Sequence, residues 1–255
     1  MGAVRATRLD GRAPSLTTTT VDGITVQADE AARRAGVLVA FSGRRGGVSE
    51  PPYDSLNLAL TLGDRPSAVH ENRRRVAAVL GFQPWALALA VQVHGCDVIR
   101  VRRGQGGLVG TADGMVTQSR RPVLGLLTAD CAPVVMLGRR LAVAHAGWRG
   151  LVGGMVEAAA APAGPVRTAW VGPSIRSCCY EVGPDVIDAF TAAGLPVADD
   201  RHVDIPEAAA AALRALGVRD IAVSEVCTGC DPGWFSHRHD GTTGRNGAFA
   251  ALRRV

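Results

Sequence analysis

Three short apolar runs, each leading into a residue able to bind a metal, place the tightest constraint on how this chain can fold. The runs are Leu87–Val93, which leads into His94, Val123–Leu127, which leads to Cys131, and Leu141–Ala144, which leads into His145. Runs of this length and composition predict buried β-strands. If the three strands are neighbours in one sheet, their ends converge, and two imidazoles and a thiol meet at one edge of that sheet.

The remaining pattern mixes strands and helices without strict alternation, which predicts an α+β fold. A further strand is expected over Gly36–Phe41, and helices are expected over Pro66–Leu80, Gly150–Ala161, Pro184–Ala193 and Pro206–Leu216. No repeat or linker divides the chain, so residues 37–255 are expected to form one domain. Residues 1–36 are expected to be a loosely held N-terminal arm that adds at most a strand at Ile24–Val26.

The basic residues limit the chemistry, because all 28 are arginines and the chain contains no lysine. Without a lysine amine there is no Schiff base, no phosphate-loop lysine and no Ser-Lys dyad. Any anion must therefore be held by arginine, histidine or backbone N–H groups.

Charge and apolar pattern exclude two classes of partner. The net charge of +5 comes from arginines scattered along the chain, with no basic tail and no interleaved aromatic residues, so no nucleic acid is expected. No apolar run approaches the ~18 residues of a membrane span, and the N-terminus has no apolar signal region. The sequence therefore predicts a cytoplasmic protein without a membrane partner, whose six cysteines are thiols or ligands.

The three residues at the strand ends suit one metal. Two imidazoles and one thiolate are a set of donors that Zn²⁺ accepts, and three protein ligands leave a fourth position open, as in catalytic sites. The alternative is three separate residues, with His94 and His145 in loops and Cys131 as a small buried apolar side chain. Spacing alone leaves both interpretations open.

The local sequences around these residues resemble the laccase-domain (YfiH-like) family, formerly labelled multicopper polyphenol oxidases and now associated with purine nucleoside phosphorylase activity. The segments that carry the resemblance are Gln92–Gly95, Thr128–Val134 and Val143–Gly150, together with Phe41–Ser49, Ser55–Leu58, Ala112–Thr117, Gly172–Ile175, Cys179–Val182 and Asp240–Arg245. They occur in the family's order and extend over about residues 38–250.

The resemblance implies a layered α/β/β/α sandwich with mixed sheets. It implies that His94, Cys131 and His145 bind zinc, which copper could displace on purification because Cu²⁺ binds such ligands more tightly. It further implies phosphorolysis of adenosine, inosine and methylthioadenosine to a base and ribose 1-phosphate or methylthioribose 1-phosphate, with adenosine deaminase as a side activity. Purine nucleosides and phosphate are then the partners.

Five further residues are candidates for catalysis. Arg44, Arg149 and Arg245 lie in loops that match the family's, and their guanidinium forks could orient phosphate and compensate its charge. Asp130 and Asn57 are candidates for proton transfer or ribose contacts. The alternative for these last two is a turn acid and a loop-capping amide.

Two departures from the family pattern alter the rim of the expected site. Gly43 stands where the family often has Thr, and residues 236–240 read Ser-His-Arg-His-Asp where the family usually has Ser-Tyr-Arg-Arg-Asp. His237 and His239 could be additional ligands, but two histidines in a surface loop are the favoured interpretation.

A second group of cysteines is weighed separately. Cys227-Thr-Gly-Cys230 is a CxxC motif that could form a four-sulfur zinc site with Cys178 and Cys179. Adjacent cysteines are not the second pair that such a site normally uses. A family Cys-Thr segment next to an incidental thiol is therefore the favoured interpretation.

Three rival functions remain. The strongest is a metal-independent cysteine hydrolase or amidase with a Cys131–His145 dyad, such as a peptidoglycan-precursor editing enzyme. A non-catalytic metal-binding regulator is another. Multicopper oxidase chemistry is disfavoured, because a blue copper centre would take two of the six histidines and leave too few for a trinuclear copper cluster.

Overall fold

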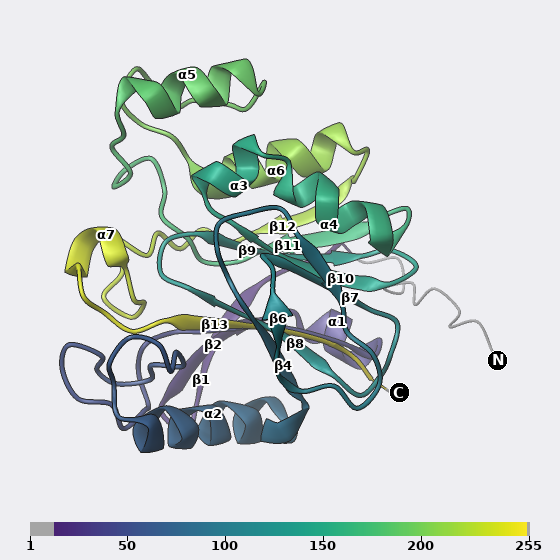
Figure 1. Cartoon of the computed structure of the whole chain (residues 1–255), viewed down its shortest axis with the longest axis vertical. Coiled ribbons are helices and arrows are strands. Elements are labelled where there is room, and N and C mark those ends of the chain that lie inside the picture. The colour runs from purple at the N-terminus through teal and green to yellow at the C-terminus, as the bar shows by residue number, and fades with distance from the viewer. Residues whose placement is uncertain (1–12, 254–255) are drawn as a thin grey trace.

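A computed structural model describes residues 13–253 of the chain, which fold around two packed β-sheets (Figure 1). Within these residues, one sheet contains β1 (Thr17–Val21), β2 (Ile24–Ala28), β3 (Val37–Ser42), β13 (Asn246–Leu252), β8 (Val123–Thr128), β4 (Leu87–Val91) and β6 (Gly107–Thr111), in that spatial order. The other contains β12 (Asp220–Val223), β11 (Thr168–Val171), β9 (Ala132–Leu137), β10 (Leu141–Ala146), β7 (Gly114–Thr117) and β5 (Val98–Arg100). Both sheets mix parallel and antiparallel pairs.

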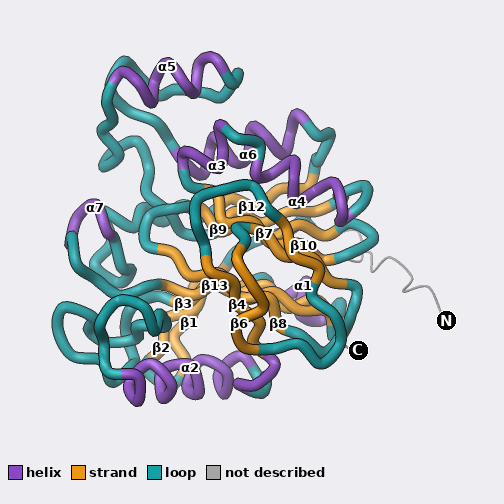
Figure 2. The backbone as a smooth tube through the Cα atoms, viewed as in Figure 1, coloured by secondary structure: helices purple, strands orange, loops and turns teal. Residues whose placement is uncertain are grey.

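The helices are α1 (Glu30–Arg34), α2 (Pro66–Leu80), α3 (Trp148–Val152), α4 (Met155–Ala163), α5 (Pro184–Ala192), α6 (Ile205–Ala215) and α7 (His237–Asp240), with a 3₁₀ turn at Pro84–Ala86. Helix α2 covers the outer face of one sheet, and α3, α4 and α6 cover the outer face of the other (Figure 2). The helix predicted over residues 66–80 is confirmed: it begins with Pro66 in its first turn and ends at Gly81, whose φ of 68° is the left-handed cap that glycine favours. The helix predicted over 150–161 is two helices, because the chain turns at Gly154, with φ of 84°.

Three apolar clusters hold the layers together. Side chains between the two sheets, among them Phe41, Leu126 and Trp170, form the central cluster. Val76 and Leu80 of α2 pack against the outer face of the first sheet. Helices α3, α4 and α6 cover the outer face of the second sheet through a third cluster, so the predicted α+β fold, an α/β/β/α sandwich, is confirmed.

The N-terminal segment is more tightly held than the sequence suggested. The strand expected at Ile24–Val26 is confirmed as part of β2, but β2 pairs with β3, and the side chains of Ile24 and Val26 are buried. The Trp170 indole N–H also donates to Asp29 at 2.8 Å. Residues 13–36 therefore belong to the sandwich, because the hairpin extends the sheet. Residues 1–12 of the predicted arm lie outside the described part of the chain.

The strands that carry the predicted metal ligands are not three neighbours in one sheet. β4 and β8 pair in the first sheet, whereas β10 belongs to the second. β10 and β8 face each other across the central cluster, so the three strand ends still converge, at the end of the seam between the sheets. Within residues 13–253, no helix has the length and apolar character that a bilayer crossing needs.

Candidate metal centre and its surrounding loops

His94, Cys131 and His145 meet in space. One ligand atom from each lies within 4.8 Å of the others, and the two imidazole rings pack edge to face with centroids 4.8 Å apart. Cys131 precedes β9 directly, and His94 lies three residues beyond β4. His145 lies inside β10 rather than after it, where it pairs with Pro133 of β9 and its backbone N–H donates to the Asp113 carbonyl at 2.8 Å.

Asp113, which the sequence analysis assigned no role, organises the centre. Its side chain is fully buried, and its Oδ1 accepts hydrogen bonds from His145 Nδ1 at 2.8 Å and from the backbone N–H of His94 at 3.0 Å. Its Oδ2 accepts from the N–H groups of Val93 and Gly95 at 3.1 and 2.8 Å. Because a carboxylate only accepts, Nδ1 of His145 carries the hydrogen, and its Nε2 keeps a lone pair for a metal.

The backbone near His94 and Cys131 adopts two features that let these ligands come together. His94 has a positive φ of 60°, a conformation that the three bonds from its loop to Asp113 hold in place. A Cβ on Gly147 would lie 2.8 Å from Cys131 Sγ and 3.0 Å from His94 Nδ1. Only glycine lets α3 begin this close to the thiol and the ring.

The electrostatics of the centre favour a charged thiolate. Burial raises the pKa of Cys131, but its interactions with His145 and His94 outweigh burial and lower that pKa to about 6. Burial lowers the pKa of His145, but hydrogen bonding to Asp113 and to Cys131 raises it to about 9. Thiolate character at neutral pH is what a soft metal requires of a cysteine ligand.

These features together fit a metal with three protein ligands. The donors are two nitrogens and one sulfur, a carboxylate fixes the ring orientation of His145, and Gly147 has no Cβ to press on two of the ligands. Zn²⁺ accepts this set of donors. The structure therefore favours one shared site over three separate residues.

Asp130 lies beside Cys131 and has a structural role. Its carboxylate is buried and accepts hydrogen bonds from the Thr228 hydroxyl and from the backbone N–H of Arg238, both at 2.7 Å. The residue therefore joins the β8–β9 loop to the loop before α7. Its proposed part in proton transfer stays a prediction.

Asn57 is also engaged. Its amide nitrogen donates to Asp64 Oδ2 and to the Ala59 carbonyl, and its Oδ1 accepts from the N–H groups of Ala59 and Arg245. The side chain is fully buried. These contacts show how Asn57 positions the backbone of Arg245, and a ribose contact stays a prediction.

The structure separates the three candidate arginines. Arg245 is half-buried, and burial lowers the pKa of its guanidinium, while the charges of Cys131 and Asp130 oppose that change. Arg149 is exposed, with its guanidinium stacked 4.3 Å from the Trp148 ring centroid. Within residues 13–253, neither guanidinium forms a salt bridge.

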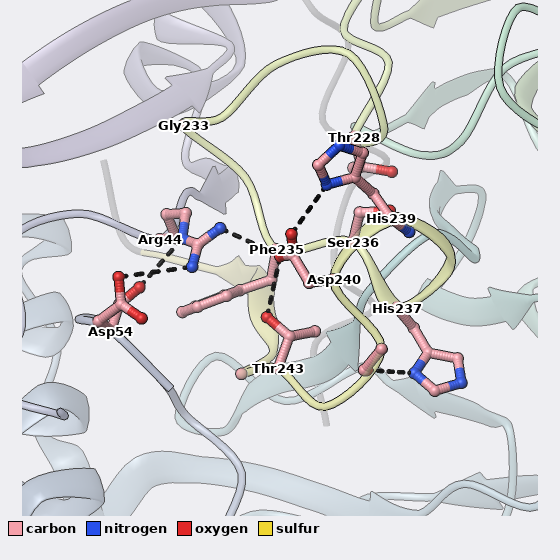
Figure 3. Close-up of polar contacts among 12 residues, drawn as sticks. Arg44, Asp54, Thr228, Gly233, Phe235, Ser236, His237, His239, Asp240 and Thr243 are labelled. Carbon is pink, nitrogen blue, oxygen red and sulfur yellow. Dashed lines mark hydrogen bonds and ion pairs between the residues drawn. The ribbon is translucent and has the colours of Figure 1, made fainter. Parts of the chain in front are cut away.

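Arg44, by contrast, is already paired. Its guanidinium contacts Asp240 at 3.1 Å and Asp54 at 3.5 Å and stacks on Phe235, as Figure 3 shows. In the same view, His239 Nδ1 contacts Asp240, and His237 is turned away with its ring against the Gly241 carbonyl. Both histidines are exposed and lie outside the metal centre, which fits the interpretation as surface residues.

Five cysteines lie outside the centre, and all of them except Cys96 form a second cluster. Cys178, Cys179, Cys227 and Cys230 bring their sulfurs within 4.8 Å of one another. The chain folds the two cysteine pairs onto each other, an arrangement that the interpretation of Cys230 as an incidental thiol did not anticipate.

Comparison with known proteins gives concordant results. The family model described as "Multi-copper polyphenol oxidoreductase laccase" matches residues 38–253. Purine nucleoside phosphorylase YfiH of Escherichia coli is 39% identical over 231 residues, which cover 85% of this chain and 94% of that protein. Purine nucleoside phosphorylase SCO2081 of Streptomyces coelicolor is 40% identical over 233 residues, covering 85% and 96%. The crystal structure of YlmD from Geobacillus stearothermophilus superposes with a TM-score of 0.84 at 32% identity, covering 94% of this chain and all of that one.

Proposed function

Because this chain belongs to the multi-copper polyphenol oxidoreductase laccase family, we propose that it is a zinc-dependent purine nucleoside phosphorylase. The observation that carries the proposal is the convergence of His94, Cys131 and His145 around Asp113, in a chain whose curated relatives bear that name. The proposed substrates are adenosine, inosine and methylthioadenosine, with phosphate as the second substrate. The free cysteines fit the reducing cytoplasm as the site of action.

The reaction requires a held anion and a stabilised sugar cation. The bond between C1′ of the ribose and N9 of the purine breaks, and a phosphate oxygen bonds to C1′. The purine leaves with the electron pair and takes up a proton. Orienting the phosphate beside C1′ converts a bimolecular encounter into an intramolecular step, and a bidentate arginine supplies both geometry and charge.

Arg149 and Arg245 are the arginines best placed for that role. Burial raises the pKa of Tyr180, and the charges of Cys131, Arg238, Asp130 and Arg149 also act on it, so all four lie near enough to Tyr180 to interact. The charges of Cys131 and Asp130 act on the pKa of Arg245 as well. Arg44 would first have to give up Asp54 and Asp240.

A zinc ion held by His94, Cys131 and His145 supplies Lewis acidity and activates water, which is the chemistry that the proposed adenosine deaminase side activity needs. The chain's own contribution is orientation. Asp113 fixes the tautomer of His145 and, through the loop of residues 93–95, the position of His94.

The family's name refers to copper oxidase chemistry, which the described residues do not favour. Two groups of potential metal ligands occur in residues 13–253, and neither contains any of the remaining histidines, His70, His202, His237 and His239. A trinuclear copper cluster has no histidines to bind it in that part of the chain.

A metal-independent cysteine hydrolase is the second candidate, and one observation favours it. Cys131, His145 and Asp113 form a chain of nucleophile, base and orienting carboxylate, and the low pKa of Cys131 would make it a nucleophile. The same three groups therefore serve two chemistries, which differ in whether a metal is required.

The deciding assay measures hypoxanthine release from inosine with and without phosphate, and repeats it with adenosine and methylthioadenosine. The proposal predicts phosphate-dependent release, ammonia from adenosine, and loss of metal and activity in Cys131→Ser. Cys96→Ser is the matched control, because Cys96 lies outside both ligand groups. Equal release without phosphate would indicate a nucleoside hydrolase, and activity after complete chelation with a covalent adduct on Cys131 would indicate the dyad.

A further inference from the structure

Two loops at the same end of the second sheet bring four cysteine sulfurs together, in a group that shares no residue with the proposed active centre. Cys178 and Cys179 lie in the loop after β11, and Cys227 and Cys230 lie in the loop after β12. Cys230 Sγ lies 3.4 Å from Cys178 Sγ and 3.2 Å from Cys179 Sγ, and all four sulfurs lie within 4.8 Å of one another.

These separations match a metal better than a disulfide. A tetrahedral site with Zn–S bonds of about 2.3 Å places its sulfurs about 3.8 Å apart. Cys230 Sγ lies about 0.4 and 0.6 Å closer than that to the sulfurs of Cys178 and Cys179, and every other separation is at most 4.8 Å, so small side-chain shifts would close the site. A disulfide needs about 2.05 Å, and all four residues are free cysteines in the structure.

The backbone builds the Cys227–Cys230 half of the cluster as a tight turn. The N–H of Cys230 donates to the Cys227 carbonyl at 3.2 Å, and the N–H of Arg176 donates to Cys227 Sγ at 3.4 Å. A Cβ on Gly229 would lie 2.9 Å from Cys179 Cβ, so glycine is needed where the two loops touch. Backbone N–H groups aimed at sulfur stabilise the thiolate that a metal requires.

The other half shows why adjacent cysteines can both reach the centre. The N–H groups of Cys179 and Tyr180 both donate to the Arg176 carbonyl at 2.9 Å, so the chain turns sharply there. This turn directs the sulfurs of both Cys178 and Cys179 to Cys230. The parallel pairing of β11 with β12, continued by a bridge between Ser174 and Cys227, brings the two loops out side by side.

We propose that Cys178, Cys179, Cys227 and Cys230 bind one zinc ion in a closed, four-thiolate structural site, separate from the His94–Cys131–His145 centre. The four sulfurs occupy all four tetrahedral positions, which leaves none for water or substrate. Binding converts four thiols into four thiolates and releases four protons, with no change in oxidation state.

The site would join two loops that border the active centre. Thr228, within the CxxC turn, donates to Asp130 next to Cys131. Tyr180, which follows Cys179, packs its ring 4.7 Å from the guanidinium of Arg238, whose backbone N–H also donates to Asp130. A metal between the loops therefore fixes the positions of Thr228 and Tyr180 without touching substrate.

Metal analysis of the full-length protein tests the proposal directly. Protein purified under reducing conditions with added zinc should hold two equivalents per chain, one for each ligand group. The double variant Cys178→Ser/Cys230→Ser should hold one zinc ion, at the His94–Cys131–His145 centre. Cys131→Ser should also hold one, in the four-cysteine cluster, and Cys96→Ser should hold both ions. Cobalt-substituted Cys131→Ser should show the visible spectrum of tetrahedral thiolate-bound Co²⁺.

A measurement on the unmodified chain avoids reliance on variants that fail to fold. Alkylation with mass spectrometry should show all four cysteines protected in zinc-loaded protein and reactive after chelation, with Cys96 unchanged between the two states. One zinc per chain with all four cysteines alkylated in the loaded protein would overturn the proposal. A Cys178–Cys230 or Cys179–Cys230 disulfide that survives in protein prepared with reductant would overturn it as well.

Discussion

Asp113→Asn is the substitution that most directly tests how the proposed active centre is built. The change keeps the size of the side chain and replaces one carboxylate oxygen by an NH₂ group. Each oxygen of Asp113 accepts two hydrogen bonds, Oδ1 from His94 and His145 and Oδ2 from Val93 and Gly95. Whichever way the amide is turned, two of these four donors then face an NH₂ group inside the fold.

The structure sets the size of the effect. Hydrogen bonds to a charged group contribute about 1.5–3 kcal/mol each, so the loss of two should lower the free energy of unfolding by about 3–6 kcal/mol. Residues that orient a metal ligand change metal affinity by about 10–100-fold. The zinc dissociation constant of the His94–Cys131–His145 centre should therefore rise by at least tenfold.

Two measurements check this expectation: zinc affinity by competition with a chromophoric chelator, and urea unfolding of the metal-stripped protein. Asp97→Asn is the matched control, because Asp97 is a nearby exposed acid whose side chain makes no hydrogen bond within residues 13–253. If Asp113→Asn binds zinc as tightly as Asp97→Asn and unfolds at the same urea concentration, Asp113 does not hold the centre together and the reasoning fails.

Three further predictions follow from particular contacts. Gly147→Ala should weaken zinc binding in the same chelator assay, because the new Cβ would lie 2.8 Å from Cys131 Sγ, whereas the backbone φ of −78° suits alanine as well as glycine. Unchanged zinc affinity would show that the thiol can move aside. In metal-stripped protein, the rate of alkylation of Cys131 should be half-maximal near pH 6, because only the thiolate reacts and it is lost as the pH falls below the pKa of the thiol. Cys96 should react only at higher pH, because burial and the charge of Asp113 raise its pKa, and coincident pH profiles for the two cysteines would refute this prediction. Asn72→Ala should lower the free energy of unfolding by about 3 kcal/mol or more in urea titrations, because this fully buried side chain makes four hydrogen bonds whose partners it would leave unpaired. His70→Ala on the exposed face of the same helix should change it by less than about 0.5 kcal/mol.

Local periodicity was enough to predict strands β2, β3, β4, β8 and β10, the helix over 66–80 and the ligand candidates at the strand ends, because these depend on neighbours in the chain. It failed where the answer depends on pairing between distant segments. The sequence placed His94 and His145 at the edge of one sheet, but β4 and β10 lie in different sheets. Apolar alternation shows that a strand is buried without showing which sheet it joins.

Asp113 was missed for a related reason. Its partners lie 18–20 residues before it and 32 residues after it, so no local spacing connects them. The signal that could have found it is a lone acid directly before the short apolar run of β7, since a buried carboxylate needs partners. The Cys178–Cys179 pair was likewise judged by its spacing, although the turn at Arg176 makes the spacing irrelevant.

The two cysteine-containing centres are joined through Asp130, and this connection explains its geometry. Asp130 has a positive φ of 94°, which a non-glycine residue holds only when its surroundings fix it. Those surroundings are the Thr228 hydroxyl from the CxxC turn and the N–H groups of Arg238 and Ile175, which bond to its carboxylate and its carbonyl. Since Cys131 follows Asp130 directly, the direction of the thiol toward His94 and His145 depends on the loop that the second cluster holds. Asp130 therefore acts on the centre through position, whether or not it also transfers a proton.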